Sequence, residues 1–327
     1  MLYGLLSKIM ADRVLILVAS ILSFIISYFM MSRPPRFLPR DGGKFVTDPN
    51  GKLIEVNKGS NGKVTGIGLI FVSIYILTVL LFLPISRELI LYLALSILMM
   101  LTGYLDDISR TPWGELVKGI LDLVLSIAGA LVFVLHNSTD VTLFKLHFHI
   151  PVVIYFILAV ALIWGSINVT NCTDGVDGLA GSVAVIELFG FSAIFGLDLG
   201  KYSGMSLILA FVLVGYLAYN WYPSTVLMGD AGSRTIGFTI ALLALRSHHP
   251  FAFILLSLVY LFDGGVGLLK LTIMRVLKKD FLKNIRFPFH DHLKKNLKWK
   301  VTTIVIFFAV IEIVMVVICG VIVNLCK

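Results

Sequence analysis

Long apolar stretches recur along the whole chain and restrict its fold more than any other feature. Such stretches begin near residues 14, 65, 88, 116, 151, 179, 203, 235, 250 and 301, and each is long enough, at about 20 residues, to cross a bilayer as a helix. Of the 327 residues, 58% are hydrophobic and only 14% are charged. The sequence therefore predicts an all-α, polytopic membrane protein with about ten transmembrane helices and a single domain over residues 1–327.

Basic residues divide unequally between the two sets of loops that ten spans would create. The set made of residues 32–63, 106–118, 165–178, 221–234 and 275–300 contains 19 Lys and Arg residues, whereas the termini and the remaining loops contain 7. The positive-inside rule predicts that the first set is cytoplasmic and that both termini lie outside. The net charge of +8 then suits lipid headgroups and phosphates, and it requires no nucleic-acid partner.

The first polar motif on the predicted cytoplasmic side is GYLDDISRTPWGELVKG, which contains Asp106, Asp107 and Lys118. Adjacent residues of a helix point about 100° apart, so one carboxylate can face a pocket while the other binds a cation or holds a neighbour. Carboxylates at a membrane edge are costly, which makes them candidates for a functional site rather than solvated helix ends.

The second motif, NVTNCTDGVDGLAGS, follows directly on an apolar stretch. Asn171, Asp174 and Asp177 recur at a spacing of three residues, which places them on one face of a helix. Gly175 and the glycines after it keep the backbone accessible at the start of the next helix, where free N–H groups favour phosphate. An ordinary helix cap would need only one such polar residue.

Two further motifs lie in predicted cytoplasmic loops. YNWYPSTVLMGDAGSRTIGF contains Asn220 and Asp230, and RFPFHDHLKKNLKW contains His290 and His292 on either side of Asp291. The two His residues and Asp291 could supply three ligands, but no fourth ligand lies nearby to complete a zinc site. Contacts to phosphate are therefore the better interpretation of the two His residues. Asp263, in the apolar sequence LFDGGVG, is interpreted either as a buried structural partner or as a catalytic group.

Carboxylates, amides, Gly-rich helix starts, His and Lys on one membrane face predict a site for a divalent cation and phosphates. Ligation by oxygen favours Mg²⁺ or Mn²⁺ over zinc. A site at the ends of membrane helices can accept one soluble substrate and one lipid, and the metal offsets charge on a transferring phosphoryl group.

The sequences LTGYLDDISR, NVTNCTDGVDGLAGS, MGDAGS and PFHDHL, in this order, resemble the polyprenyl-phosphate N-acetylhexosamine-1-phosphate transferases. Within that family, PRDGG followed by NKGSNGKVTGIG is most similar to the branch with a muramoyl-pentapeptide donor. The resemblance implies transfer of a phospho-sugar from a uridine diphosphate (UDP) sugar to undecaprenyl phosphate, with Mg²⁺ and release of UMP. It also implies a bacterial plasma membrane, surrounding lipids as partners and an active site that faces the cytoplasm.

The resemblance also assigns roles to residues. It implies that Asp230 binds Mg²⁺, that Asp106 is the base for the lipid phosphate, and that Asp107 supports both. Lys58, with Lys63 as the alternative, matches the lysine of the nucleotide site, and Leu227 stands where relatives carry a Phe that stacks on uracil. The other positions implied to bind substrate are Lys118, Asn171, Asp174, Gly175, Asp177, Asn220, His290 and His292.

Two departures from the family leave alternatives open. Asp291 replaces the middle residue of three consecutive His, and GSNGKVTGIG replaces GTPTMGG. A sister enzyme with an N-acetylglucosamine donor therefore stays open, as does an ion-coupled transporter, although the carboxylates lie mainly at one membrane face. A homodimer is one arrangement that the sequence leaves open.

Overall fold

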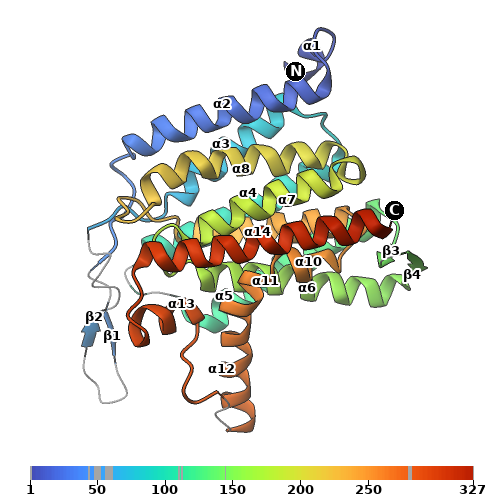
Figure 1. Cartoon of the computed structure of the whole chain (residues 1–327). Helices are drawn as coiled ribbons and strands as arrows, with labels where there is room; N and C mark the ends of the chain where they lie inside the picture. Colours follow the sequence, from blue (N-terminus) through green and yellow to red (C-terminus); the bar gives the residue numbers. More distant parts are fainter. Residues whose placement is uncertain are drawn as a thin grey trace.

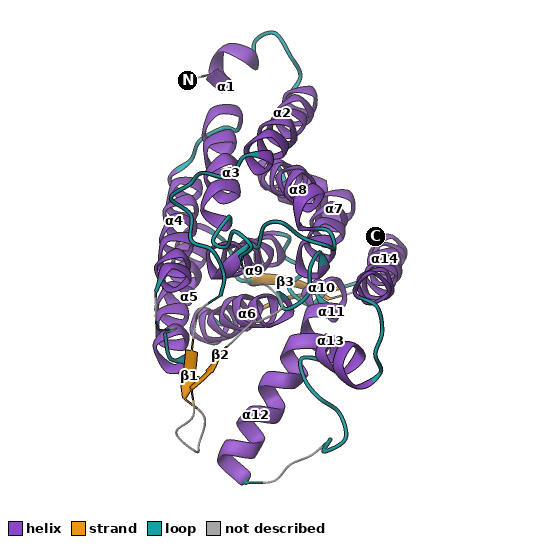
Figure 2. Cartoon of the chain, turned by 90° about the vertical axis from the view of Figure 1, so that its left-hand side faces the viewer, coloured by secondary structure: helices purple, strands orange, loops and turns teal. Residues whose placement is uncertain are grey.

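Helix α9 (Gly229–Arg246) runs through the middle of a helix bundle, as Figure 2 shows. Every residue from Ala231 to Leu245 is buried against the helices around it. The computed structural model describes residues 2–42, 45–47, 53–55, 62–109, 111, 113–143, 145–278 and 282–326. Its other helices are α1 (Leu2–Leu6), α2 (Asp12–Ser32), α3 (Gly68–Phe82), α4 (Arg87–Ile108), α5 (Glu115–His136), α6 (Val152–Thr173), α7 (Leu179–Leu199), α8 (Lys201–Asn220), α10 (Ala252–Leu256), α11 (Leu258–Tyr260), α12 (Val266–Leu277), α13 (Phe289–Asp291) and α14 (Val301–Cys326), with π-helical turns η2 (Leu261–Gly265) and η3 (His292–Asn296).

Seven helices are long and apolar enough to cross a membrane, which confirms the prediction of an all-α polytopic membrane protein. They are α2, α4, α5, α6, α7, α8 and α14. The count of ten is not confirmed within the described residues, because α3 has only 15 residues and α9 begins with a polar turn. The polar turn of α9 is tolerated because the surrounding helices, rather than lipid, cover it.

The predicted span that begins near residue 250 is not one straight helix. Its residues form α10, α11, η2 and α12, and α12 leaves the direction of the bundle (Figure 1). Lys270 is on α12, and its ammonium donates hydrogen bonds to the carbonyls of Leu282 and Ile285, each at 3.0 Å. These contacts hold the following loop against α12.

The two ends of the bundle differ in what they carry. Both termini and the hairpin of β3 (Asp140–Leu143) and β4 (Leu146–His149) lie at one end, on the right in Figure 1. The hairpin of β1 (Phe45–Thr47) and β2 (Leu53–Glu55) lies with α13 at the other end. The polar motifs converge near this second end, so they share one face of the molecule.

The first turn of α9 touches two neighbouring helices without intervening side chains. A Cβ atom on Gly68 of α3 would lie 2.1 Å from the backbone nitrogen of Gly232, and one on Gly103 of α4 would lie 2.5 Å from that of Ala231. Only glycine leaves room for such an approach. The close packing brings the end of α4, with its two Asp residues, to the start of α9.

Candidate active site

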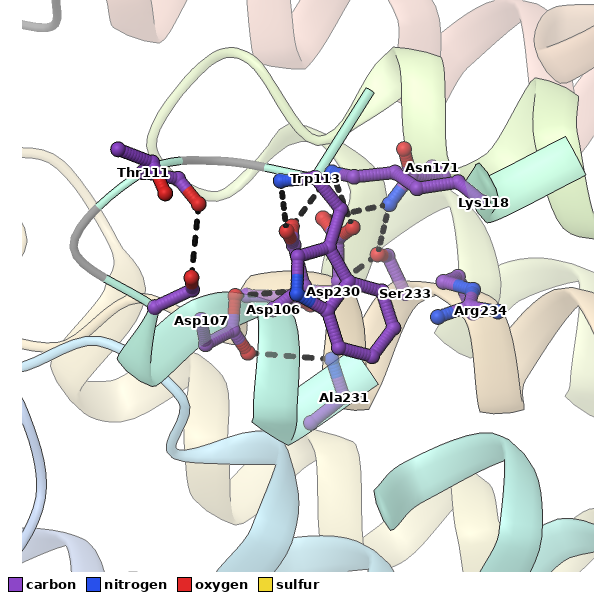
Figure 3. A network of polar contacts seen from close by, with 12 residues as sticks. Asp106, Asp107, Thr111, Trp113, Lys118, Asn171, Asp230, Ala231, Ser233 and Arg234 are labelled. Atoms are coloured by element: carbon purple, nitrogen blue, oxygen red, sulfur yellow. Dashed lines mark hydrogen bonds and ion pairs between the residues drawn. The ribbon is translucent and has the colours of Figure 1, made fainter. Parts of the chain in front are cut away.

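The ammonium of Lys118 lies between two carboxylates that come from different helices (Figure 3). Its Nζ is 2.5 Å from Oδ2 of Asp106, at the end of α4, and 2.8 Å from Oδ2 of Asp230, in the first turn of α9. The other oxygen of Asp106 accepts a hydrogen bond from the backbone N–H of Trp113 at 2.6 Å. Two predicted catalytic residues and one predicted substrate-binding residue therefore share one polar centre.

A fourth helix completes this centre through Asn171, near the end of α6. Its Nδ2 donates to Oδ1 of Asp230 at 3.0 Å and to the hydroxyl of Ser233 at 2.9 Å. The amide thereby fixes the orientation of the Asp230 carboxylate. Figure 3 shows that the side chains of Asp106, Lys118, Asn171 and Asp230 point toward one another.

Asp107 serves as an N-terminal cap for α9. Its two carboxylate oxygens accept hydrogen bonds from the backbone N–H groups of Asp230, at 3.0 Å, and Ala231, at 3.2 Å. A carboxylate at a helix N-terminus pairs with free N–H groups and with the positive end of the helix dipole. Gly229 has φ of +67°, and any side chain there would collide with Asp107. The contacts agree with a supporting role for Asp107, while its catalytic role stays a prediction.

Asp174 is a carboxylate of this site that lacks a cationic partner among the described residues. Partial burial, together with repulsion from the carboxylates of Asp230, Asp107 and Asp177, raises the pKa of Asp174 well above its usual range. Lys118 is already shared between Asp106 and Asp230. Counted over the described residues, the carboxylates around Lys118 therefore outnumber the cations, and a bound cation would relieve their repulsion.

A second polar cluster joins Lys63 to Asp177. The Lys63 ammonium is 2.8 Å from Oδ2 of Asp177 and 2.8 Å from the hydroxyl of Ser224. Burial alone would raise the pKa of Asp177, but hydrogen bonds from Lys63 and Ser224 outweigh it and hold the pKa below its usual range. Lys58, the first candidate for the nucleotide-site lysine, lies outside the described residues.

Lys63 reaches this position because its segment pairs with the loop before α9. The N–H of Val64 donates to the carbonyl of Thr225, and the N–H of Leu227 donates to the carbonyl of Val64 at 2.7 Å. The carbonyl of Leu227 accepts from the N–H of Ile67 at 3.2 Å. The pairing fixes the backbone of Leu227 and leaves its side chain half-buried.

Asn220 is buried and connects two loops of the site. Its Oδ1 accepts from the N–H of Gly178 at 2.9 Å, and its Nδ2 donates to the carbonyl of Val226 at 2.8 Å. These contacts stabilise the backbone at the start of α7 and before α9. The structure gives Asn220 this bracing contact, and its predicted role in substrate binding stays a prediction.

His290 is anchored to the site by Asp263. The backbone N–H of His290 donates to Oδ1 of Asp263 at 2.7 Å, and its ring Nδ1 is 2.8 Å from Oδ2. The opposite ring nitrogen, Nε2, faces Gly175, where an added Cβ would lie 2.4 Å from it. An imidazole held through Nδ1 can present Nε2 to a phosphate. Asp263, for which the sequence left two interpretations, is thus a buried partner of His290.

His292, the second predicted His, is engaged within its own loop. Its ring stacks on Phe289, with centroids 5.7 Å apart, and Nδ1 accepts a hydrogen bond from the N–H of Arg286. In the part of the chain that the structure describes, no three His, Cys, Asp or Glu side chains form a ready-made metal site.

Sequence reasoning missed the contributions of Ser224 and Ser233 and a buried ion pair below Lys118 and Asp230. That pair consists of Asp122, which lay inside a predicted apolar span, and Arg234, which was counted only as a basic residue of the predicted loop 221–234. The signal for it was the spacing, because each residue lies four positions after a predicted site residue on the same helix.

The chain is similar in sequence to known transferases. The model of the glycosyl transferase family 4 matches residues 89–248. A phospho-N-acetylmuramoyl-pentapeptide-transferase of Treponema pallidum is 37% identical over 321 residues, which cover 91% of this chain and 86% of the relative. Proteins with the same name from Carboxydothermus hydrogenoformans and Clostridium botulinum are 30% and 32% identical, over 80% and 65% of this chain and 84% and 67% of the relatives.

Proposed function

Since the chain belongs to the phospho-N-acetylmuramoyl-pentapeptide-transferase family, we propose that it transfers phospho-N-acetylmuramoyl-pentapeptide from its UDP-linked donor to undecaprenyl phosphate. The products are lipid I, an intermediate of peptidoglycan synthesis, and UMP. The observation that carries the proposal is the centre in which Asp106, at the end of α4, meets Lys118 and Asp230, in the first turns of α5 and α9.

The reaction forms one bond and breaks another at the phosphorus that carries the sugar. An oxygen of the lipid phosphate bonds to this phosphorus, the bond to the bridging oxygen breaks, and UMP leaves with that oxygen. Asp106 takes the proton of the lipid phosphate, and Lys118, between Asp106 and Asp230, pairs with phosphate oxygens. The Nε2 of His290 lies beside Gly175, and it is proposed to contact a phosphate of the donor.

Asp230 is proposed to hold Mg²⁺. The donor set fits this ion, because Mg²⁺ is commonly bound through one or two carboxylates and completed by substrate phosphates. Asp230 and Asp106 already present oxygens to one cationic nitrogen, and Asp174 adds a carboxylate that has no cationic partner in the part of the chain that the structure describes. When bound, Mg²⁺ supplies positive charge that offsets charge developing on the transferring phosphoryl group.

The donor is proposed to bind beside the second cluster, near Lys63, Asp177 and Leu227. The fixed backbone before α9 and the positive charge of Lys63 suit a nucleotide and its phosphates. The active site is proposed to face the cytoplasm of the plasma membrane, because the predicted loops on that side contain 19 of the Lys and Arg residues against 7 elsewhere.

The test is an assay with purified protein in detergent. It is incubated with undecaprenyl phosphate, Mg²⁺ and either the muramoyl-pentapeptide donor or UDP-N-acetylglucosamine, and UMP and lipid product are measured. We expect UMP and lipid I with the first donor, and no turnover without Mg²⁺. Turnover with UDP-N-acetylglucosamine but not with the muramoyl-pentapeptide donor would contradict the proposed donor. The absence of UMP with either donor would contradict the proposed reaction.

A further inference from the structure

A buried ion pair lies one helical turn below the bridge formed by Lys118 and Asp230. The Nε of Arg234, on α9, donates to Oδ1 of Asp122, on α5, at 2.9 Å, and Nη2 of Arg234 contacts the same oxygen. The side chains of Arg234 and Asp122 are 1% and 4% exposed. Figure 3 places Arg234 on the far side of Ser233 from Asp107, away from the polar centre itself.

The two helices carry opposite orders of charge. Along α5 a cation, Lys118, is followed after four residues by an anion, Asp122. Along α9 an anion, Asp230, is followed after four residues by a cation, Arg234. Residues four apart lie on the same helix face, so both attractive pairs form at once across a single contact between α5 and α9.

This arrangement admits only one register of α5 against α9. A shift by one turn in one direction would bring Lys118 opposite Arg234, and a shift in the other direction would bring Asp122 opposite Asp230. Both shifts bring like charges together inside a bundle where little water screens them. An apolar contact between the two helices would not penalise such a shift in the same way.

A contribution to the stability of the fold does not explain the ion pair of Asp122 and Arg234 well. Burying two charges costs desolvation free energy, and apolar residues of similar volume are often as stable or more so. Nη1 of Arg234 is also buried, and it makes no hydrogen bond with the described residues. The best-attested use of buried polar pairs is to specify a register.

Resting on the proposed function, we propose that Asp122 and Arg234 are positioning residues that fix the register of α5 on α9 and so hold Lys118 between Asp106 and Asp230. In this role they act through Lys118 and not through contacts with the donor or the lipid phosphate. Loss of the pair lets α5 shift, and the ammonium of Lys118 then departs from its place beside the reacting phosphates.

The test removes the pair without leaving an unpaired charge. In Asp122→Leu/Arg234→Leu the buried charges are replaced by apolar side chains, and in Asp122→Asn/Arg234→Gln by neutral polar ones. We expect the first variant to melt at or above the wild-type temperature. We expect kcat of both to fall about 100-fold, the scale of a misplacement of about 1 Å, with KM for the UDP-linked donor within about threefold of wild type.

A matched control lies on the same helix at its other end, where Arg246 is 3.6 Å from Glu88. The variant Glu88→Gln/Arg246→Gln removes an ion pair of α9 far from the polar centre, and we expect it to keep kcat. Wild-type kcat in either folded double variant at positions 122 and 234 would overturn the proposal. Failure of both to fold would assign the pair to stability alone, and would overturn it as well.

These outcomes are separate from those of the proposed function. Wild-type protein that releases no UMP would contradict the transferase reaction itself. A double variant with wild-type kcat would contradict only the positioning role of Asp122 and Arg234.

Discussion

At the scale of single residues, Asp230 connects three other residues of the polar centre. It meets Lys118 and Asn171 through its side chain and Asp107 through its backbone. Asp230→Asn keeps the shape of the side chain but removes the charge proposed to hold Mg²⁺. We expect turnover to fall at least about 1,000-fold, the upper range for loss of one electrostatic contact to the transition state, with an unchanged melting temperature.

The control for this variant is Asp140→Asn, which removes an exposed carboxylate at the opposite end of the bundle. UMP release and thermal unfolding of both variants provide the measurements. Turnover of Asp230→Asn near that of wild type, at ordinary Mg²⁺ concentration, would remove Asp230 from the proposed metal site.

Asp177 predicts a pH dependence of stability. Its pKa is lowered in the folded protein, so its ion pair with Lys63 stabilises the fold above the unfolded pKa, about 3.9, and this contribution disappears as the pH falls through the folded pKa. Asp177→Asn should lose about 1 kcal/mol of stability at pH 7. The difference in melting temperature from wild type should shrink below about pH 4. A difference that grows on acidification would contradict the ion pair.

Leu227 predicts an effect on donor binding. Base stacking on an aromatic ring contributes about 1–3 kcal/mol, and Leu supplies apolar contact without a ring face. If the half-buried side chain faces the uracil, Leu227→Phe should lower KM for the UDP-linked donor several-fold and leave kcat nearly unchanged. Steady-state kinetics measures both, and an unchanged or higher KM would show that position 227 does not face the base.

At the scale of elements, the π-helical turn η2 anchors the loop that carries α13. Asp263 of η2 accepts both hydrogen bonds that fix His290. Asp263→Ala should free this loop, increase tryptic cleavage at Lys283 and Arg286 several-fold, and lower kcat. Asp291→Ala, which removes an ion pair with Lys295 in the same loop, should change neither. Equal cleavage of the two variants would contradict the anchoring role.

The elements also show what the sequence could predict. Helical geometry indicated that Asp106 and Asp107 point in different directions, and the structure places one on Lys118 and the other on the N-terminus of α9. Periodicity could not identify the partner of Asp263, because His290 lies 27 residues away and meets it only through the fold. For the same reason, the contact between Lys63 and Asp177, 114 residues apart, required the structure.

At the scale of the whole molecule, the placement of the polar centre and the termini at opposite ends, together with the positive-inside rule, predicts which end of the bundle faces the cytoplasm. The polar centre lies at one end of the bundle, and the termini with β3 and β4 lie at the other (Figure 1). In a background without Cys172, Cys319 and Cys326, Thr225→Cys should resist an impermeant thiol reagent added to intact cells, while Ser138→Cys should react. Both positions are exposed at the surface of the structure. The reverse labelling pattern would place the active site outside.

The central position of α9 has a consequence for how the protein is made. Insertion of α9 into a bilayer by itself is unfavourable, because the helix carries the charged residues Asp230, Arg234 and Arg246. It is not among the seven helices that qualify as membrane spans by length and composition. The helices that enclose it at the site, α3 to α6, all precede it in the chain and leave the ribosome earlier. We therefore expect membrane integration of α9 to require a nascent bundle that already offers Lys118 and Asp122 as partners for its charges.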